Sequence, residues 1–564
     1  MSRGPRGLPL RLRYFDAKRR STETATSPTA WGEIQEASMT NPDKTMRDLI
    51  DSIAAARATL DDSARAPAID KLHARGKLSA RERVARLVDP GSFTEIGGLV
   101  AEDDEQGSGA DNRARSPADG VVVGTARIDG RPVMVLSQDF SVFGGSIGKL
   151  GSAKTRRAVQ IAVTSGLPLV FILDGGGHRI QDGQDARHFA HANGMFHDMA
   201  RASGWIPVVA LMLGAGFAGP TNYAGLADFV VMVRGLSTMG LAGPALVKAA
   251  TGEDIDTLAL GGAEIQVDKQ GLADLGVTDE DAAFAAARRF LSYLPGNARA
   301  AAAITSCDQP AGPVGDAILD LVPVSTRKAY DVRKVLALIA DTGSVFEIKP
   351  TFAGNLVTAF ARLDGRPVGL IANQALRLGG MIDANACDKG AHFIALCDAF
   401  GLPLISFIDV PGFAIGSGAE RTNLGRRSAK LIYEWGHASV PRISVVLRKG
   451  YGLGYFAMCG GRSFSADAAF AWPSAEICAM SIEGAIDVAY RKEVQAAADP
   501  QARRQQMIDE TRTRVGALRG AEGFGIDDVI DPRDTRRRLI EVLARAQPRR
   551  PNDHPPKFRS ITPI

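Results

Sequence analysis

The chain has 564 residues, 45% of them hydrophobic, and its 67 basic and 63 acidic side chains leave a formal net charge of +4. This length exceeds what one hydrophobic core normally organises, so two or more domains are expected. The balance of charge gives no argument for nucleic acid binding. The five cysteines form no close CxxC pair, which argues against a zinc knuckle and a disulfide framework. We therefore expect no metal in this chain and a reducing, cytoplasmic setting.

Residues 1–45 differ in composition from the rest of the chain. The first twenty residues contain seven basic side chains and a single acid, Asp16. An Arg-rich, acid-poor start is typical of an organellar transit peptide. No apolar secretory core follows, so we favour a disordered extension, or a true start at Met39 or Met46, over a transit peptide.

A helical pattern runs from Thr45 to about Ala85 and includes a strongly basic run at residues 73–83. Ser79 and Glu82 have the spacing of a capping box that begins a helix. The basic run has two interpretations, a solvated helix face and a patch that contacts phosphate.

Strands and helices alternate through the next part of the chain. Two β-rich runs, Val121–Ile128 and Val133–Ser137, predict a hairpin. A helix over Lys154–Ser165 and a buried strand over Pro168–Leu173 follow. This alternation predicts a largely parallel sheet that is covered by helices.

The uncharged stretch from residue 203 to 227 has the composition of a membrane span but not its continuity. Glycine and proline interrupt it, and it lacks about 18 consecutive apolar residues. We expect a buried strand followed by a glycine-rich loop there, and no contact with a membrane.

One long stretch of the chain occurs twice. Ala126–Gly177 aligns without a gap with Ala361–Gly412, and Asp129 and Asp364, Lys154 and Lys389, and Asp174 and Asp409 are each 235 positions apart. A fixed offset of domain size indicates two copies of one domain. We therefore expect an α/β fold with domains at 46–296 and 316–548, a linker at 297–315 and a tail at 549–564.

Four glycine-rich turns follow buried strands, at Gly175–Gly177, Gly214–Gly219, Val410–Phe413 and Gly450–Gly454. Such turns expose backbone N–H groups at the start of a helix, where the helix dipole favours negative charge. Paired N–H groups stabilise an oxyanion, so two turns in each domain suggest two carbonyl-bearing ligands that face each other. The alternative is that glycine only permits tight turns and close packing. The nucleotide motif GxxxxGK[ST] is absent.

Side chains offer weaker candidates for chemistry. His178, beside Gly177, is a candidate general base, although a single histidine is more often structural. Asp174 and Asp409 occupy matching places, which suggests that they cap turns. No catalytic triad and no metal-ligand set is recognisable.

Seven motifs, in this order, resemble the carboxyltransferase (β) subunit of biotin-dependent acyl-CoA carboxylases of the propionyl-CoA carboxylase type. They are RGKLSARERVARLVDPGSF (75–93), SQDFSVFGGS (137–146), DGGGHRIQDG (174–183), RKAYDVR (327–333), FIDVPGF (407–413), VPRISVVLRKGYGLGY (440–455) and AWPSAEICAM (471–480). The resemblance covers about Met46 to Ala546. It implies two tandem crotonase-like (ClpP-like) domains, which agrees with the internal duplication.

The resemblance also implies a reaction, the transfer of CO2 from carboxybiotin to the α-carbon of an acyl-CoA. Acyl-CoA would bind mainly to the first domain and carboxybiotin to the second, across a dimer interface within a hexamer. Backbone N–H groups of Gly176 and Gly177 would hold the acyl enolate, and those of Leu453 and Gly454 the biotin ureido carbonyl. Because biotin itself would take up the α-proton, no side-chain base is needed.

The family implies partners and further site residues as well. Biotin would arrive on a biotin carboxylase/biotin carboxyl carrier (α) subunit, because this chain has neither an AMKM-like biotinylation motif nor an ATP-grasp part. The residues carried over for the acyl-CoA are His178, Phe456, Ala218, Gly219, Arg75 and Lys77. Those carried over for biotin are Val410, Pro411, Gly412, Phe413 and Tyr451.

The chain departs from the family pattern in three loops. Asp-Gly-Gly-Gly-His at 174–178 replaces Asp-Ser-Gly-Gly-Ala, Gly-Phe-Ala-Gly-Pro at 216–220 replaces Cys-Ala-Gly-Gly-Ala, and Tyr-Gly-Leu-Gly-Tyr-Phe at 451–456 replaces Tyr-Gly-Gly-Ala-Tyr-Asp. Backbone donors tolerate such changes. In the family, position 456 lines the acyl pocket, so Phe456 puts propionyl specificity in question.

Three other functions remain open on these residues. The first is the reverse half-reaction, as in a biotin-dependent acyl-CoA decarboxylase subunit. The second is a non-catalytic scaffold subunit whose loops have drifted. The third is a crotonase-type hydratase without biotin, which would need a carboxylate beside the thioester, and Glu476 and Glu483 are its only candidates.

Overall fold

The computed structural model describes residues 44–102, 109–184, 186, 190, 194–307, 309, 312–549 and 561. Nearly all of the expected extension at 1–45 and most of the tail at 549–564 therefore lie outside the described residues. The chain divides into two units, one that ends at Ala55 and one that begins at Ala56. Helix α1 (Met46–Ala58) begins in the first unit, where the Thr45 hydroxyl donates to the Asp48 carboxylate at 2.7 Å.

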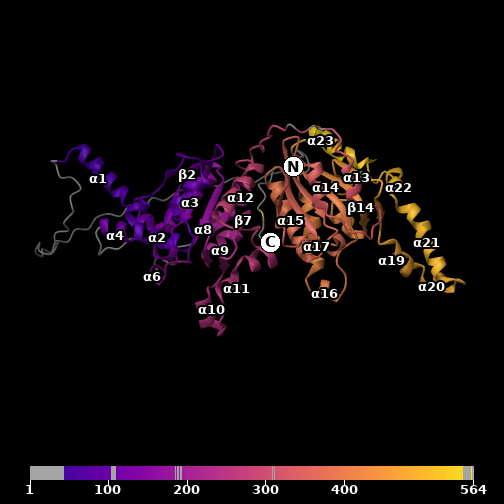
Figure 1. Ribbon diagram of the computed structural model, residues 1–564, viewed down its shortest axis with the longest axis horizontal. Helices are drawn as coiled ribbons and strands as arrows, with labels where there is room; N and C mark the ends of the chain where they lie inside the picture. Colours follow the sequence, from indigo (N-terminus) through magenta and orange to yellow (C-terminus); the bar gives the residue numbers. More distant parts are fainter. Residues whose placement is uncertain are drawn as a thin grey trace, which may run out of the picture. The chain divides into compact units, whose positions relative to one another are not determined.

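The second unit contains a sheet of seven strands in the order β1-β2-β3-β4-β5-β7-β9 (Figure 1). The first two pairings are antiparallel and the other four are parallel. This is the mixed but largely parallel sheet that the alternation of strands and helices predicts. Its strands are β1 (Thr94–Glu95), β2 (Val121–Ile128), β3 (Arg131–Gln138), β4 (Leu169–Leu173), β5 (Val208–Met212), β7 (Phe229–Val233) and β9 (Leu275–Val277).

A second sheet repeats this order later in the chain, as β10-β11-β12-β13-β14-β15-β17, and an eighth strand, β16, pairs with β14. Its strands are β10 (Phe346–Ile348), β11 (Leu356–Leu363), β12 (Arg366–Asn373), β13 (Leu404–Val410), β14 (Arg442–Tyr451), β15 (Ala468–Ala471), β16 (Glu476–Cys478) and β17 (Asp528–Val529). The α/β fold with two sheet domains is thus confirmed.

Helices connect and cover both sheets. Those of the first half are α2 (Ala66–His73), α3 (Ala80–Leu87), α4 (Gly109–Arg115), α5 (Lys149–Ser165), α6 (Ile180–Gly183), α8 (Gly194–Ala202), α9 (Gly219–Gly225), α10 (Pro244–Thr251), α11 (Thr257–Gly261) and α12 (Glu280–Tyr293). Those of the second half are α13 (Ala317–Leu321), α14 (Val332–Ile339), α15 (Ala384–Ala399), α16 (Ser417–Glu420), α17 (Leu424–His437), α18 (Gly452–Ala457), α19 (Ile482–Ala489), α20 (Arg491–Ala496), α21 (Pro500–Val515), α22 (Ala517–Glu522) and α23 (Thr535–Arg545). The predicted capping box is confirmed at the start of α3, where Ser79 and Glu82 exchange hydrogen bonds.

The duplication holds residue by residue. Val121 pairs with Gln138 across β2 and β3, and Leu356 pairs with Asn373 across β11 and β12, each 235 positions further on. The next pairing repeats too, since Met134 faces Leu169 and Gly369 faces Leu404. The repeated sequence therefore specifies the strand register as well as the strands.

The side chains of the parallel strands alternate between two cores, as the period of two requires. In the first sheet, Phe171 points towards α5 and α8, whereas Val170 and Ile172 point towards α3 and α12. In the second sheet, one face packs against α15 and α17 and the other against α14 and α23. The inner faces share a single core, in which α12 of the first half contacts β11 of the second through Phe290 and Phe360.

Aromatic rings cross this shared core. The ring centroids of Phe229 and Phe290 are 4.4 Å apart, those of Phe290 and Phe360 5.8 Å, and those of Phe360 and Phe393 5.1 Å. A buried ion pair, Asp274–Lys349 at 3.0 Å, joins the two halves nearby. Because the halves share one core, the domain boundaries at 296 and 316 stay a prediction.

The segment at residues 214–219 differs from its prediction. It was expected to be a glycine-rich loop, but Ala215–Phe217 form a short strand, β6, that pairs in parallel with β8 (Thr238–Gly240). Backbone N–H groups that a loop would leave unpaired are satisfied in this way.

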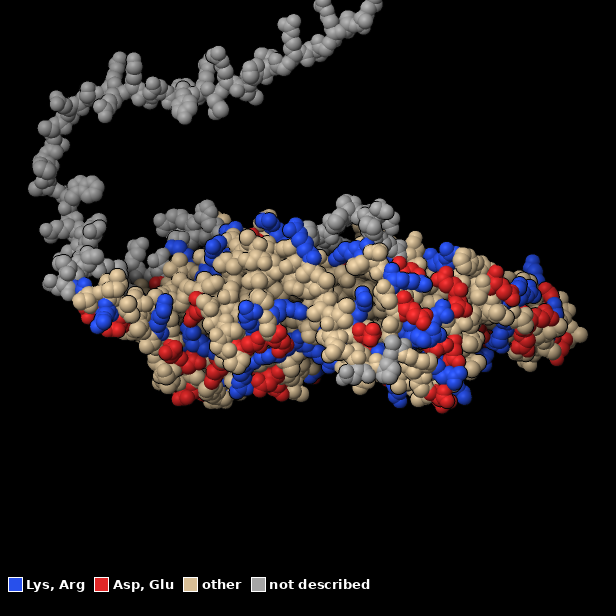
Figure 2. Space-filling view, turned by 90° about the horizontal axis from the view of Figure 1, so that it is seen from above, with Lys and Arg blue, Asp and Glu red and all other residues tan. Residues whose placement is uncertain are grey.

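No helix among the described residues is long and apolar enough to cross a membrane. On the face shown in Figure 2, basic and acidic side chains are interspersed.

Candidate active site

The turn after β4 is built by close packing of glycine backbones. A Cβ atom at Gly175 would lie 2.1 Å from the carbonyl oxygen of Gly145, and one at Gly145 would lie 2.2 Å from that of Asp174. Glycine is therefore required at these two positions for packing. A Cβ atom at Gly176, in contrast, would have no neighbour within 4 Å. The turn is open towards solvent at Gly176.

The N–H groups of this turn differ in their partners. The Gly175 N–H donates to the Ala215 carbonyl at 2.6 Å, and the Gly176 N–H makes a long contact of 3.4 Å with the Gly144 carbonyl. Within the described part of the chain, the Gly177 N–H has no acceptor. A Cβ atom at Gly177 would lie 2.9 Å from that of Ala218, so the predicted residues Ala218 and Gly219 lie beside this turn.

In the second half the offset of 235 places the equivalent turn at Val410–Gly412, after β13, and the start of α18 packs against this second turn. Tyr451 is the N-cap residue, but its side chain makes no hydrogen bond to the helix, so the N–H groups of Leu453 and Gly454, in the first turn of α18, lack the usual cap. A Cβ atom at Gly454 would lie 2.9 Å from the Cα atom of Gly412 and 3.0 Å from Val410 Cγ2. The structure thus places Gly454 beside Val410 and Gly412, two of the residues predicted for biotin, whose role stays a prediction.

The two turns are related by the duplication. Ile147 forms a parallel bridge with His178, and Ile382 forms the same bridge with Phe413. His178 and Phe413 therefore occupy equivalent places, one predicted for the acyl-CoA and the other for biotin. His178 is half-buried next to Gly177.

A buried carboxylate, that of Asp174, begins the first turn and is bound by two cationic side chains. Asp174 has no exposed surface, and its two oxygens bind Lys77 at 2.8 Å and Arg83 at 2.9 Å. Arg83 also binds Glu280 at 2.7 Å. The expectation that Asp174 caps the turn is thus wrong. A carboxylate buried this deeply needs cationic partners, and the helix α3 region supplies them.

The basic run at 73–83 fits neither of its interpretations as a whole. Lys77 and Arg83 face inward to Asp174, and Arg81 pairs with Glu95 at 3.0 Å. Arg75 is exposed. The Lys77 ammonium is engaged by Asp174 and lies 4.3 Å from the centre of the Phe140 ring. Contacts of Arg75 and Lys77 with a substrate stay a prediction.

The second turn has a matching carboxylate. Asp409 is fully buried and binds Arg448 at 3.0 Å and Lys449 at 2.6 Å, so it also does not act as a turn cap. An amide side chain accepts the aspartate N–H in both halves, Gln138 at 2.9 Å and Asn373 at 3.2 Å. These amide and cationic side chains were missed from the sequence. Gln138 and Asn373 share the offset of 235, which is the signal that would have found them.

The rim of the second turn is apolar and exposed. The exposed fractions of Leu453 and Phe456 are 55% and 49%. Behind them, the Tyr451 hydroxyl donates to Glu476 at 2.6 Å, and Arg512 reaches the other oxygen of Glu476 at 3.3 Å. Glu476 is thus committed to Tyr451 and Arg512, which makes it a poor candidate for the hydratase carboxylate.

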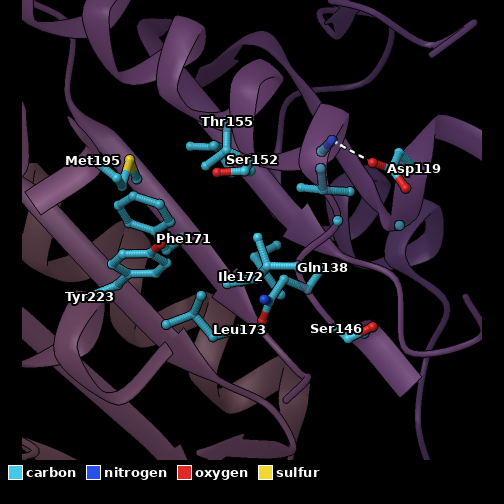
Figure 3. Close-up of a pocket in the computed structure, with 17 residues that line it drawn as sticks. Asp119, Gln138, Ser146, Ser152, Thr155, Phe171, Ile172, Leu173, Met195 and Tyr223 are labelled. Atoms are coloured by element: carbon cyan, nitrogen blue, oxygen red, sulfur yellow. Dashed lines mark hydrogen bonds between the residues drawn. The ribbon is translucent and has the colours of Figure 1, made fainter. Parts of the chain in front are cut away.

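A small cavity lies beside the first turn, between β3, β4 and α5 (Figure 3). Its volume is about 30 Å³, which is room for about two water molecules. Gly145 and Ile147, which also contact the turn, line one part of it, and the Phe171 and Tyr223 rings face each other at 6.0 Å in another. Burial raises the pKa of Tyr223 to about 12. The cavity is too small for an acyl-CoA, so a ligand of that size would bind on the open side of the turn.

The similarity to known proteins extends over both halves of the chain. Residues 71–561 match the family model described as "Carboxyl transferase domain". The chain is 41% identical over 504 residues to the methylmalonyl-CoA carboxyltransferase 12S subunit of Propionibacterium freudenreichii subsp. shermanii, covering 88% of this chain and 94% of that one. It is 37% identical to the propionyl-CoA carboxylase carboxyltransferase subunit of Haloferax mediterranei, and the match covers 92% of this chain and 99% of that one.

Two further relatives add a structure and a second activity. The crystal structure of the transcarboxylase 12S hexamer with methylmalonyl-CoA and methylmalonic acid bound matches with a TM-score of 0.84 and 40% identity, covering 92% of this chain and 99% of that one. The methylmalonyl-CoA decarboxylase subunit alpha of Veillonella parvula is 36% identical, covering 87% and 94%.

The fold, the two matched turns and these similarities define the class: the chain belongs to the carboxyl transferase family. The function expected from the motifs is confirmed at this level, a carboxyltransferase subunit of the biotin-dependent acyl-CoA carboxylases. No group of three or more His, Cys, Asp or Glu side chains that could hold a metal ion occurs among the described residues.

Proposed function

We propose that this chain moves a carboxyl group between biotin on a separate carrier subunit and the α-carbon of an acyl-CoA, in the direction of carboxylation. The observation that carries the proposal is a pair of backbone donor sites, one in each half: the Gly177 N–H has no acceptor among the described residues, and the N–H groups of Leu453 and Gly454 lack a cap at the start of α18, beside the turn equivalent to that of Gly177. Each site can hold one carbonyl group. A homo-hexamer with sites across dimer interfaces, assembled with a biotin carboxylase and carrier subunit in the cytoplasm, completes the proposal.

The residues take the following roles in it. The N–H groups of Gly176 and Gly177 stabilise the negative charge that develops on the thioester oxygen when the α-proton leaves, and one such donor contributes about 3–4 kcal/mol. His178, Ala218, Gly219 and Phe456 shape the acyl site, and Arg75 and Lys77 contact the CoA part. Bound carboxybiotin supplies both the CO2 and the base.

The biotin ring would fit the second turn because its floor is a cradle without side chains. Gly412 and Gly454 lie so close there that a Cβ atom on Gly454 would be 2.9 Å from the Gly412 Cα atom. Val410, Pro411, Phe413 and Tyr451 border this cradle. Leu453 and Gly454 donate N–H groups to the ureido carbonyl.

The test is bicarbonate fixation by the purified chain with biotin carboxylase and a biotinylated carrier, measured across a panel of acyl-CoA chain lengths. Labelled product with at least one acyl-CoA is expected. Absence of product with every acyl-CoA, from a protein that forms its hexamer, would rule out carboxylation.

Three variants separate the backbone donor from the side-chain space. Gly177→Pro removes the N–H group, and Gly177→Ala keeps it while adding the same Cβ atom, 2.9 Å from that of Ala218. We expect turnover of Gly177→Pro to be about 10²- to 10³-fold below that of Gly177→Ala. Gly176→Ala keeps its N–H group and has open space for the methyl group, so near wild-type turnover is expected. Equal turnover in the two Gly177 variants would refute the role of this N–H group.

The reverse reaction is a second candidate, because a relative at 36% identity is named a methylmalonyl-CoA decarboxylase subunit. Incubation of the chain and biotinylated carrier with a carboxylated acyl-CoA would distinguish the two. Release of the carboxyl group without uptake in the forward assay would favour the decarboxylase.

A further inference from the structure

The charges around the equivalent aspartates Asp174 and Asp409, each at the start of its turn, are not the same. In the first half, Asp174 and Glu280 face Lys77 and Arg83, so two negative groups balance two positive ones. All four are buried. The first turn therefore rests on a buried cluster with no net charge.

In the second half, Asp409 alone faces Arg448 and Lys449. The exposed fractions of the three side chains are 0%, 1% and 9%. Three carbonyl oxygens, of Pro323, Ser325 and Lys328, accept from Arg448 Nη1 in place of a second carboxylate. They supply dipoles but no charge, so this cluster has a net charge of +1.

Other titratable groups near the cluster do not cancel this charge. Glu476 is the register partner of Lys449 across β14 and β16, but its oxygens are bound by Arg512 and Tyr451. Burial and the nearby Asp409 carboxylate raise the pKa of Tyr330, which keeps its hydroxyl neutral. Counting Glu476 together with Arg512 leaves the net charge at +1.

The titration of Lys449 agrees with an excess of positive charge. Burial lowers the pKa of its ammonium group even though Asp409 lies at 2.6 Å and opposes the shift. Lys449 shares the single Asp409 carboxylate with Arg448, so its charge is not fully compensated. An anion that binds nearby would stabilise this buried cation further.

The cluster adjoins the second turn in sequence and in strand register, since Asp409 directly precedes Val410. Lys449 is followed by Gly450, which pairs with Val410 across β13 and β14, and Val410 contacts the Gly454 backbone. We propose that the Arg448–Lys449–Asp409 cluster makes the second turn selective for an anionic ligand, whereas the neutral cluster under the first turn suits an uncharged carbonyl. Lys449 is the positioning residue that sets this preference.

The inference rests on the proposed function, and it matches the chemistry of the two ligands. A thioester reaches its turn uncharged, and its charge develops only as the α-proton leaves. A carboxylated ureido ring reaches its turn with a full negative charge, and when the N–C bond breaks the electron pair stays on the ring and the charge is retained. A permanent positive charge is of use only on the second side.

The test measures binding, without acyl-CoA and without turnover. The probes are both made from biotin amide, in which the valerate carboxyl group is blocked: its N1-carboxymethyl derivative, which is an anion, and its N1-carbamoylmethyl derivative, which has nearly the same shape and no charge. We expect the wild-type protein to bind the acid about tenfold more tightly than the amide. Lys449→Gln, which keeps a donor for Asp409 without the charge, should lose this preference, and Lys449→Arg should retain it.

The first half supplies the control, because a lysine from another part of the chain makes the same contact there. Lys77→Gln removes the ammonium that binds Asp174, and because the binding test contains no acyl-CoA, the preference for the acid should stay as in the wild type. Equal affinity of the wild-type protein for acid and amide would overturn the inference, as would a loss of preference in Lys77→Gln as large as in Lys449→Gln. The carboxylation assay is separate, so a protein that prefers the acid but fixes no bicarbonate would refute only the proposed function.

Discussion

Ala218 holds a backbone conformation that is unusual for a residue with a side chain. Its φ is 61° and its ψ is −120°, at the N-cap of α9. The equivalent place in the second half is occupied by Gly452, with φ 58°. The surrounding contacts impose the conformation, because the Ala218 N–H donates to the Gly240 carbonyl at 2.8 Å. Strain of this kind costs on the order of 1–3 kcal/mol and is typical of functional loops.

Replacing Ala218 with glycine should relieve this strain. We expect Ala218→Gly to raise the free energy of unfolding by about 1 kcal/mol, measured by urea denaturation. The matched control is Ala224→Gly, inside the same short helix, which should lower it by about 0.5–1 kcal/mol. Destabilisation by both substitutions to the same degree would show that position 218 is not strained.

Asp228 is a second residue with a testable energetic consequence. Its carboxylate is fully buried and accepts the Val208 N–H at 2.8 Å, and burial raises its pKa to about 8. In the unfolded chain this group titrates near pH 4. The folded protein therefore holds the extra proton between about pH 4 and pH 8, and the stability this proton contributes is lost as the pH rises through that window.

The Asp228→Asn variant removes that dependence and keeps an acceptor for Val208. Its free energy of unfolding relative to the wild type should increase from pH 4 to pH 8, by up to several kcal/mol. Urea denaturation at a series of pH values measures it. Asp281→Asn, at an exposed side chain, should give curves parallel to the wild type, and parallel curves for Asp228→Asn would contradict the prediction.

Helix α18 and the turn after β13 form one unit at the scale of secondary structure. They meet at Gly454 and Gly412 without any side chain between them. A helix placed in this way fixes its first N–H groups relative to the turn to within a fraction of an ångström, and displacement by about 1 Å is enough to lower turnover about 10²-fold.

The Gly454→Ala variant tests this contact. Its methyl group would lie 2.9 Å from the Gly412 Cα atom, so α18 must move away from the turn. We expect carboxyl transfer to fall by about 10²-fold with little change in the affinity for acyl-CoA. Gly418→Ala, where the methyl group meets nothing within 4 Å, is the control. Unchanged transfer in Gly454→Ala would mean that the helix start does not position the reaction.

The elements were more predictable than the contacts between them. The expected hairpin at Val121–Ile128 and the strand at Pro168–Leu173 lie within a few residues of β2 and β4, because local periodicity specifies them. The partners of Asp174 were not predicted, since Lys77 and Arg83 lie 97 and 91 positions away and no local pattern links them. The strand β6 was missed because glycine-rich sequence favours a loop until a partner strand is present.

At the scale of the whole molecule, the two halves behave as one body because their inner faces share a core. Phe360 is at its centre, with the rings of Phe290, Tyr293 and Phe393 between 5.1 and 5.8 Å away. All four of these aromatic residues are buried. Removing Phe360 therefore affects both halves at once.

We expect Phe360→Ala to lower the free energy of unfolding by about 3–5 kcal/mol and both halves to lose structure in one transition. Calorimetry, with near-UV circular dichroism as a second probe, measures this. Val324→Ala, at a position that is 80% exposed, should change stability by less than about 0.5 kcal/mol. Two separate transitions in the wild-type protein would show that the halves unfold independently.

The shared core also has a genetic consequence. The segment at 297–315 is the covalent connection between the two halves, and Ile561, near the end of the chain, exchanges hydrogen bonds with Ser203 of the first half. If the gene were divided within this segment, each product would expose the aromatic face that the other covers. The two polypeptides should therefore complement each other when they are expressed together, and neither should accumulate alone.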